Sequence, residues 1–372
     1  MPMFAPASLG PPLPGVERIA VLRANSIGDF LVALPALEAL RAAYPAARIT
    51  LLGCDWHAAF LRGRPSPVDQ VVPVPGSAGV RDDCPPAGPQ ALEAFFQRQR
   101  AERYDLAVQL HGGGAHSNPF TRRLGARVAV GSRAPEAETL DRWVPYRSLQ
   151  PEIFRFLEVV GLVGAAPGTV TPQVAVTGED LREAEQAVPA DPAGRPLVVL
   201  HPSATDQRRR WPADRFAHVA RALARCGCQL VACGGATEAD RELTAAVAAA
   251  APVADLGGRL SLGGLAGLLA RCQLLIGNDS GPRHLAEAVG VPTVSIYWCG
   301  NLVNVGPLTR ARHRVLTSWR LDCPVCGRNC MRDDCDHRVS FVAGISPDEV
   351  LAEAVDLLGS QPPDGLRPKS KP

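Results

Sequence analysis

The stretch from Leu274 to Trp298, LLIGNDSGPRHLAEAVGVPTVSIYW, constrains the fold of this chain more than any other. An apolar run stops at a polar turn, Asp279 to Pro282, and apolar residues then recur at helical spacing as far as Gly290. Gly290 is typical of a helix end, and the apolar residues after Pro292 indicate another strand. This order of strand, turn, helix and strand predicts a βαβ unit.

The turn in this unit is a candidate anion site. Ser280 and Gly281 lie where the helix starts, and free backbone N–H groups and the helix dipole attract negative charge there. The alternative is an ordinary capped turn that binds nothing, so the rest of the chain has to decide between the two.

The same pattern opens the chain. A strand at Arg18–Arg23 leads through a polar turn to apolar residues at helical spacing over Phe30–Ala43, and a second strand follows at Arg48–Gly53. The turn is not GxGxxG, so the dinucleotide fingerprint of dehydrogenases is absent. Strands and helices alternate in both halves, which predicts an α/β protein of two doubly wound, Rossmann-like domains. Ligands of such domains bind beyond the strand C-termini, so we expect the site in an interdomain cleft.

Glycine and proline punctuation predicts the domain limits. The boundary is placed in the irregular stretch 164–178, and loops are expected at 143–150 and 300–306. We expect a disordered arm (1–15), an N-terminal acceptor-side domain (16–172) and a C-terminal donor-binding domain (173–345) with a Cys-rich loop (322–337). A C-terminal helix (346–360) follows, for which crossing back onto the N-terminal domain is an open alternative, and a tail (361–372) ends the chain.

Composition excludes several classes of protein. The formal charge of the 372 residues is +2, which gives no electrostatic field for nucleic acid. Apolar runs fall far short of the roughly 20 residues of a membrane-spanning helix. The first residues lack the pattern of a signal peptide, so we expect a cytoplasmic protein whose cysteines are reduced.

Three strand-end turns of the second half carry candidate ligand-binding residues. Ser203 and Thr205 offer hydroxyls, Arg209 offers a planar cation for phosphate oxygens, and Glu238 offers a carboxylate for ribose hydroxyls. As alternatives, the run Arg208 to Arg210 is a solvated surface patch, and Glu238 only begins a helix. Together with Ser280 and Gly281, these groups suit a diphosphate without a metal.

The first half offers a candidate base. Asp29 lies where a helix begins, and a carboxylate there either caps the helix or accepts a proton from an attacking hydroxyl. Gly28 allows the backbone to approach a ligand closely. Gln109 and His111 end another strand of this half, where we expect an acceptor pocket.

With these residues in view, the chain resembles glycosyltransferase family 9, the heptosyltransferase-like enzymes of bacterial lipopolysaccharide assembly. Three blocks carry the resemblance: RANSIGDFLVALPALEALRAAYPAARITLL from Arg23, HPSATDQRRRWPADRFA from His201, and GNDSGPRHLAEAVGVPTVSIY from Gly277. It implies the GT-B fold and an inverting, metal-independent transfer of a heptose from an ADP-sugar to a lipid-linked or oligosaccharide acceptor. The lipid of such an acceptor leaves peripheral contact with the inner membrane open, and no part of the sequence indicates a dedicated anchor.

The resemblance assigns roles to several of these positions. Asp29 falls on the general base. Arg209 stands where the family usually has Lys, in a loop that looks one residue longer, which leaves Arg210 as the alternative contact. Gln109 replaces the usual acid, which leaves the acceptor open. Positions that fall near the donor are Ser26, Gly28, Thr205, Glu238, Asp279, Ser280, Gly281 and His284.

A cysteine cluster, DCPVCGRNCMRDDCDH, follows near the C-terminus. Its spacing allows a structural zinc site formed by Cys323, Cys326, Cys330 and Cys335, with His337 beyond. A disulfide pair or free thiols are the alternatives. No cofactor is expected for catalysis.

Two other functions stay open beside glycosyl transfer. A sugar-nucleotide epimerase on the same fold would need further acid and base groups around the donor sugar. The other is a non-catalytic nucleotide-sugar-binding protein whose acceptor pocket has decayed, and the presence of Asp29 and Arg209 disfavours it. A dehydrogenase is disfavoured because neither half has GxGxxG.

Overall fold

The computed structural model describes residues 10–333 and 335–359, so the predicted tail and most of the predicted arm lie outside it. The described residues divide into two compact units, one formed by 10–175 with 303–308 and the other by 176–302 with 309–333 and 335–359. The described end of the arm packs on the first unit. There the Gly10 N–H donates to the Gly161 carbonyl at 2.9 Å, and the Leu13 N–H donates to the Tyr44 hydroxyl at 3.1 Å.

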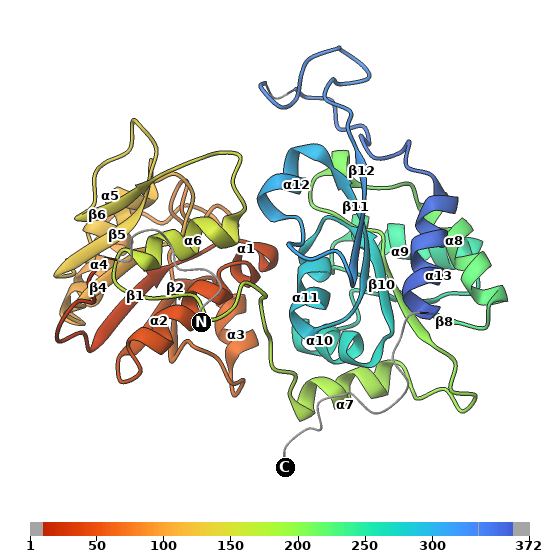
Figure 1. Ribbon diagram of the computed structural model, residues 1–372, viewed down its shortest axis with the longest axis horizontal. Helices are drawn as coiled ribbons and strands as arrows, with labels where there is room; N and C mark the ends of the chain where they lie inside the picture. The colour runs from red at the N-terminus through yellow and green to blue at the C-terminus, as the bar shows by residue number, and fades with distance from the viewer. Residues whose placement is uncertain (1–9, 334, 360–372) are drawn as a thin grey trace. The chain divides into compact units, whose positions relative to one another are not determined.

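Within the described residues, the first unit is a six-stranded sheet with helices on its faces (Figure 1). Its strands are β1 (Arg18–Leu22), β2 (Arg48–Gly53), β3 (Gln70–Pro73), β4 (Leu106–Gln109), β5 (Val128–Arg133) and β6 (Arg142–Pro145). Its helices are α1 (Ile27–Leu31), α2 (Leu34–Ala43), α3 (Asp55–Leu61), α4 (Pro89–Ala101), α5 (Ser117–Arg122) and α6 (Glu152–Gly161).

The strand order of this sheet is β3-β2-β1-β4-β5-β6, and neighbouring strands are parallel. The central strand β1 is apolar on both faces because helices cover both. Ala20 and Leu22 pack in a cluster with Phe95 and Phe96 of α4, while α2 packs against α6. Strands β2 and β3 follow on one side of β1, and strands β5 and β6 follow on the other side of β4. The strand order therefore reverses between β1 and β4, and ligands bind beyond the C-terminal ends of the strands at such a topological switch point.

The second unit repeats this architecture. Its strands are β7 (Leu197–His201), β8 (Gln229–Gly234), β9 (Ala254–Gly257), β10 (Leu274–Asn278), β11 (Thr293–Trp298) and β12 (His313–Ser318). Its helices are α7 (Gly178–Ala187), the short 3-10 helix η1 (Gln207–Arg209), α8 (Ala213–Arg225), α9 (Glu238–Ala250), α10 (Leu262–Arg271), α11 (Gly281–Val289) and α13 (Pro347–Gly359). A further helix, α12 (Cys299–Val305), follows β11.

The second sheet has the order β12-β11-β10-β7-β8-β9, which places its switch point between β7 and β10. Helix α10 packs against α7 and α11, and α8 packs against α9 and α13. The sequence left open that the C-terminal helix crosses back onto the N-terminal domain. Instead, α13 belongs to the second unit, where Val350, Ala354 and Leu357 join the core around Trp211 and Phe216.

The predicted α/β class and the two doubly wound sheets are confirmed, but three local predictions were wrong. The predicted helix at 30–43 is two helices, α1 and α2, because Pro35 has no N–H for a continuous helix and instead lies in the first turn of α2. The stretches 143–150 and 300–306 were predicted as loops, yet they contain most of β6 and α12. Pairing of Trp143 with Gly131 creates β6, and periodicity could not reveal it. No described helix is both long and apolar enough to cross a bilayer.

Candidate functional site

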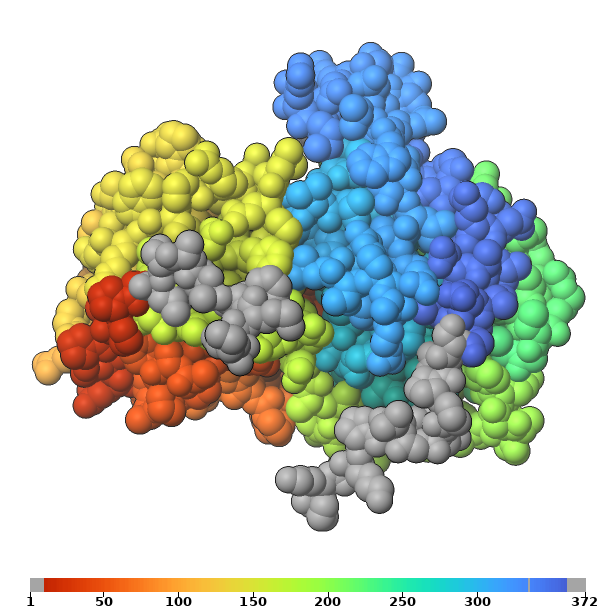
Figure 2. All heavy atoms as spheres, viewed as in Figure 1, coloured from red at the N-terminus to blue at the C-terminus, as the bar shows by residue number. Residues whose placement is uncertain are grey.

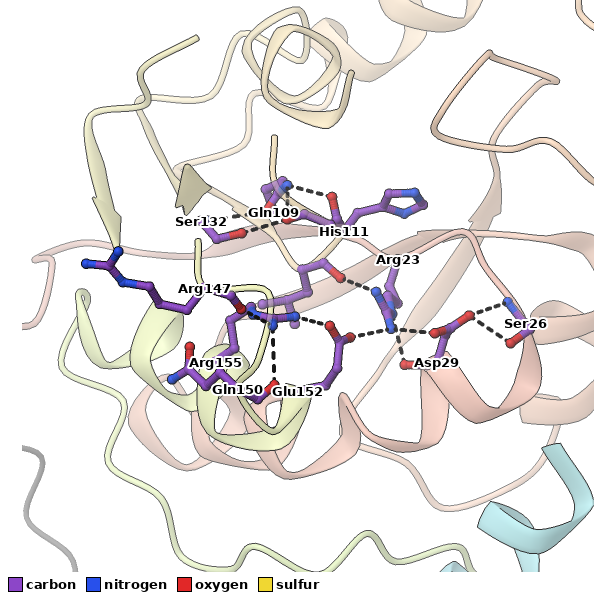
Figure 3. A network of polar contacts seen from close by, with 12 residues as sticks. Arg23, Ser26, Asp29, Gln109, His111, Ser132, Arg147, Gln150, Glu152 and Arg155 are labelled. Carbon is purple, nitrogen blue, oxygen red and sulfur yellow. Dashed lines mark hydrogen bonds and ion pairs between the residues drawn. The ribbon is translucent and has the colours of Figure 1, made fainter. Parts of the chain in front are cut away.

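In the first unit, Asp29 lies beside the end of β1, and both of its carboxylate oxygens are held. Oδ1 is 3.1 Å from Nη2 of Arg23, and Oδ2 accepts hydrogen bonds from the Ser26 hydroxyl at 2.7 Å and the Ser26 N–H at 3.2 Å (Figure 3). The side chain is nevertheless 34% exposed. Asp29 therefore acts as the acid that caps α1, and it also presents a fixed carboxylate to the solvent.

Arg23 connects this carboxylate to the sheet. Its guanidinium is almost fully buried and donates through Nε to the Asp29 carbonyl at 2.9 Å and through Nη1 to the Leu110 carbonyl at 2.8 Å. Nη2 also reaches Glu152 Oε2 at 3.2 Å, and the other oxygen of Glu152 pairs with buried Arg155. One planar cation thus joins the ends of β1 and β4 to the first turn of α6, which fixes the position of Asp29.

The end of β4 carries Gln109 and His111. Gln109 is fully buried, and its amide donates to the His111 carbonyl at 2.7 Å and accepts from the Ser132 N–H at 3.4 Å, so it holds the strand-end turn (Figure 3). Burial, and then the charge of Arg23, lower the pKa of His111 to about 4. The imidazole is therefore neutral near pH 7.

In the second unit, Asp279 is the centre of a polar cluster at the end of β10. Its carboxylate is 1% exposed and accepts from Arg209 Nη1 at 3.0 Å and from Asn301 Nδ2 at 2.8 Å. His284 Nε2 lies 3.9 Å from the same carboxylate. Burial and the neighbouring Arg283 hold the pKa of His284 well below its ordinary value, so the imidazole is neutral there. Asp279 thus orients Arg209 while leaving the Arg209 side chain 22% exposed.

Asn278 ties two strand ends together. Its Oδ1 accepts from the Trp211 N–H at 3.1 Å, and its Nδ2 donates to the Pro202 carbonyl at 2.8 Å. The turn after β7 is closed further by Arg210, whose Nε donates to the Ala204 carbonyl at 2.7 Å. Because Arg210 is engaged within its own turn, Arg209 is the better placed of the two predicted alternatives to meet a ligand.

Several buried polar atoms at these strand ends have no hydrogen-bond partner within the described part of the chain. They are Asn25 Oδ1 after β1, His111 Nδ1 after β4 and Ser203 Oγ after β7. Buried polar atoms are nearly always paired in folded proteins, so such orphans mark places where a ligand or water completes the bonding. They lie beside the two switch points.

The structure brings the predicted residues together in two groups. Ser26, Asp29 and His111 follow β1 and β4, with Gly28 buried inside α1. Ser203, Arg209, Asp279, Ser280, Gly281 and His284 lie near the ends of β7 and β10. Thr205 and Glu238 are exposed, and Glu238 begins α9 after β8.

Sequence reasoning missed Arg23, Glu152, Asn278 and Asn301. A signal existed for Arg23, since a charge that ends an otherwise apolar central strand needs a partner. Nothing in the sequence points to Glu152, which reaches Arg23 from 129 residues further along the chain.

Comparison with known proteins decides the family. Residues 92–330 match the model of glycosyltransferase family 9 (heptosyltransferase), which is more than half of the chain. The chain belongs to glycosyltransferase family 9. It is therefore a glycosyltransferase, as the three sequence blocks predicted.

Relatives of this family 9 enzyme span most of its length. It is 27% identical over 288 residues to lipopolysaccharide heptosyltransferase 1 of Pseudomonas aeruginosa, covering 75% of this chain and 78% of that protein. A family 9 glycosyltransferase structure from Veillonella parvula matches with a TM-score of 0.73 at 23% identity, covering 93% of this chain and 98% of that one. The E. coli heptosyltransferase WaaC with ADP-2-deoxy-2-fluoro heptose matches with a TM-score of 0.61 at 20% identity, covering 80% and 92%. These structures show the shared GT-B-like fold.

Proposed function

We propose that this family 9 enzyme transfers a heptose from an ADP-sugar to a lipopolysaccharide core or a related glycan acceptor, with inversion and without a catalytic metal. The observation that carries the proposal is the Asp29 carboxylate, which Arg23 and Ser26 fix while a third of it stays exposed at a switch point. A general base needs this combination of fixed position and access.

The donor side of the proposal rests on the second unit. Backbone N–H groups at the start of α11 and the oriented Arg209 suit a diphosphate. So does the Ser203 hydroxyl, which has no hydrogen-bond partner among the described residues. Thr205 and the helix-starting Glu238 are assigned to phosphate and ribose hydroxyls. Asp279 and His284 are assigned to orienting Arg209 and the donor sugar.

The nucleotide and the acceptor are inferred from relatives. A named relative is a lipopolysaccharide heptosyltransferase, and a structural neighbour holds an ADP-heptose analogue, so we infer an ADP-sugar here. Ser26 and Gly28 are proposed to lie near the donor phosphates, and His111 to face the acceptor. Gln109 is proposed to shape the turn that carries His111. Contact with the membrane is proposed to occur through the lipid part of the acceptor.

The proposed reaction is a single displacement. The acceptor oxygen bonds to the anomeric carbon while Asp29 takes the hydroxyl proton, and the bond from that carbon to the diphosphate oxygen breaks on the opposite face. ADP leaves with the electron pair, and Arg209 and the α11 N–H groups stabilise its growing charge. Displacement from the face opposite the leaving group inverts the configuration at the anomeric carbon. The proposal requires both units to act on the same substrate pair.

The test is Asp29→Asn, which keeps the size of the side chain and the acceptor atom for Ser26. We expect kcat to fall about 10²-fold or more, because an amide does not take the proton. Binding of the ADP-sugar, measured by calorimetry, should change little. Asp214→Asn is the matched control, since Asp214 is an exposed acid in the first turn of α8.

Two results would count against the proposal. Near-normal turnover by Asp29→Asn removes Asp29 from the role of base and leaves neutral His111 as the rival. A panel of ADP-, UDP- and GDP-sugars tests the donor, and conversion of a donor sugar without an acceptor would identify an epimerase instead.

A further inference from the structure

The loop after β12 carries four cysteines for which the transfer reaction has no use. It projects beyond the body of the second unit (Figures 1 and 2). Cys323, Cys326, Cys335 and His337 each offer one ligand atom there, and these atoms all lie within 4.8 Å of one another. The metal site that the sequence allows has Cys330 as its fourth ligand. The structure groups His337 with the three thiols instead, and it places Cys330 Sγ 3.7 Å from Cys335 Sγ.

The backbone around the first two cysteines forms a tight turn whose amides face sulfur. The Gly327 N–H donates to the Cys323 carbonyl at 2.9 Å, and the Cys323 N–H donates to the Arg328 carbonyl at 2.8 Å. The N–H groups of Val325 and Cys326 bond to the Cys323 sulfur, and the Arg328 N–H bonds to the Cys326 sulfur. Gly327 has φ +70°, which glycine adopts readily. The tight turn therefore brings the Cys323 and Cys326 sulfurs close together.

His337 completes the group from the other end of the loop. Its Nδ1 is buried and has no hydrogen-bond partner among the residues that the structure describes. A buried imidazole nitrogen without a partner is costly, and a ligand bond to a metal removes that cost. Cys323 and Cys335 are buried against the core of the unit, while Cys326 is exposed.

We propose that Cys323, Cys326, Cys335 and His337 bind one transition metal ion in a tetrahedral site. Three thiolates and one imidazole are the donor set of structural zinc sites, and ferrous iron takes thiolate-rich tetrahedral sites as well. Each thiol releases its proton as the metal–sulfur bond forms. Four protein ligands leave no open position, so the ion has a structural role.

The ends of this loop contact the turn that carries Arg209. The Phe341 N–H donates to the Arg208 carbonyl at 2.8 Å, and the Ser340 hydroxyl donates to the Arg210 carbonyl at 2.6 Å. At the other end, Trp298 Nε1 donates to the Arg320 carbonyl at 2.7 Å. An ion that closes the loop therefore braces the turn from which Arg209 reaches Asp279. The effect of this bracing on donor binding rests on the proposed function, whereas the metal site does not.

The site is tested by elemental analysis of the full-length protein, purified without a histidine tag under reducing conditions. We expect about one zinc or iron ion per chain. Visible absorption distinguishes coloured ferrous or ferric protein from colourless zinc protein. Cys326→Ser, at an exposed position, should lose the ion, whereas Cys226→Ser, at an exposed position in another turn, should keep it. Wild-type protein without stoichiometric metal, or Cys326→Ser with full metal content, would overturn the proposal.

Two more variants test the fourth ligand. We expect His337→Gln to lose the ion and Cys330→Ser to keep it. The reverse result would overturn the proposed ligand set in favour of four cysteines. A disulfide between Cys330 and Cys335 in metal-free protein, detected by mass spectrometry after alkylation, would overturn the site altogether.

The bracing role has a separate readout. In Cys326→Ser, the KM for the ADP-sugar should rise several-fold with a smaller change in kcat, because the base on the first unit is untouched. An unchanged donor KM in metal-free protein would overturn the bracing role. Because metal content is measured without turnover, failure of the metal site and failure of the proposed transferase function are distinguishable.

Discussion

At the scale of single residues, the buried Arg23 controls where the Asp29 carboxylate lies. It joins Asp29, Leu110 and Glu152 through all three of its guanidinium nitrogens. The Arg23 guanidinium also lies 4.8 Å from the ring centre of Phe156, so both polar and aromatic contacts fix its orientation. Arg23 is therefore a positioning residue, since it acts on the reaction only through Asp29.

This role predicts the effect of Arg23→Lys. Lysine keeps the charge but is a point cation without the planar fork, so it cannot make all of these bonds. Under the proposed function we expect kcat to fall about 10-fold, with little change in the affinity for the ADP-sugar. Steady-state kinetics and calorimetry measure the two quantities. Arg48→Lys in the exposed pair with Glu102 is the control. Unchanged kcat in Arg23→Lys would show that Asp29 keeps its position without the guanidinium group of Arg23.

At the scale of elements, helix α11 shows how local sequence sets a helix end that the site depends on. Gly290 ends the helix, as the sequence predicted, and the structure shows that it does so in a left-handed conformation at φ +87°. Its N–H bonds back to the Glu287 carbonyl at 3.0 Å. Gly290 thus sets the C-terminal end of α11 and lets the chain turn into β11. The N-terminal end of the same helix carries Ser280 and Gly281 of the candidate site.

Gly290→Ala is expected to destabilise the protein by about 1 kcal/mol, because a Cβ disfavours this backbone conformation. Apart from its immediate neighbours in the chain, no described residue has a heavy atom within 4 Å of the added Cβ, so the cost is conformational and not steric. Gly178→Ala is the matched control, since Gly178 also has open space but lies inside the first turn of α7 without a positive φ. Urea unfolding compares the two. Equal stability of both variants would contradict the argument.

At the scale of the whole molecule, the two units have separate sheets, separate cores and separate switch points. The proposed base belongs to the first unit, and the proposed diphosphate ligands belong to the second. Donor binding and proton transfer should therefore be separable in experiments on the intact chain.

Hydrogen exchange on the full-length protein with ADP tests this division. We expect slower exchange at the amides of residues 201–211 and 278–285, because phosphate oxygens occupy N–H groups at those strand ends. Helix α4, which packs on β1 of the first sheet, should exchange at the same rate with and without ADP. Protection confined to the first unit would contradict the assignment of the donor to the second.

The sequence predicted most of the fold because its signals are local. Apolar runs of strand length, helical spacing and glycine or proline at the ends specified the βαβ units, and their alternation specified two parallel sheets. Pro35 divides the predicted helix at 30–43 through a local effect, whereas the other two errors share one cause. Edge strand β6 and helix α12 form through contacts with distant residues, which periodicity does not record.

By itself the sequence determined the α/β class, the family resemblance and the residue types at the strand ends, because turn chemistry and hydrophobic spacing act over a few neighbouring residues. Only the tertiary structure decided that Arg23 holds Asp29 together with Glu152, that Asp279 orients Arg209, and that His337 joins three cysteines. The contacts of Arg23 with Glu152 and of Arg209 with Asp279 join residues that are 129 and 70 positions apart in the chain. Their partners are chosen by strand order and packing, which no local pattern encodes.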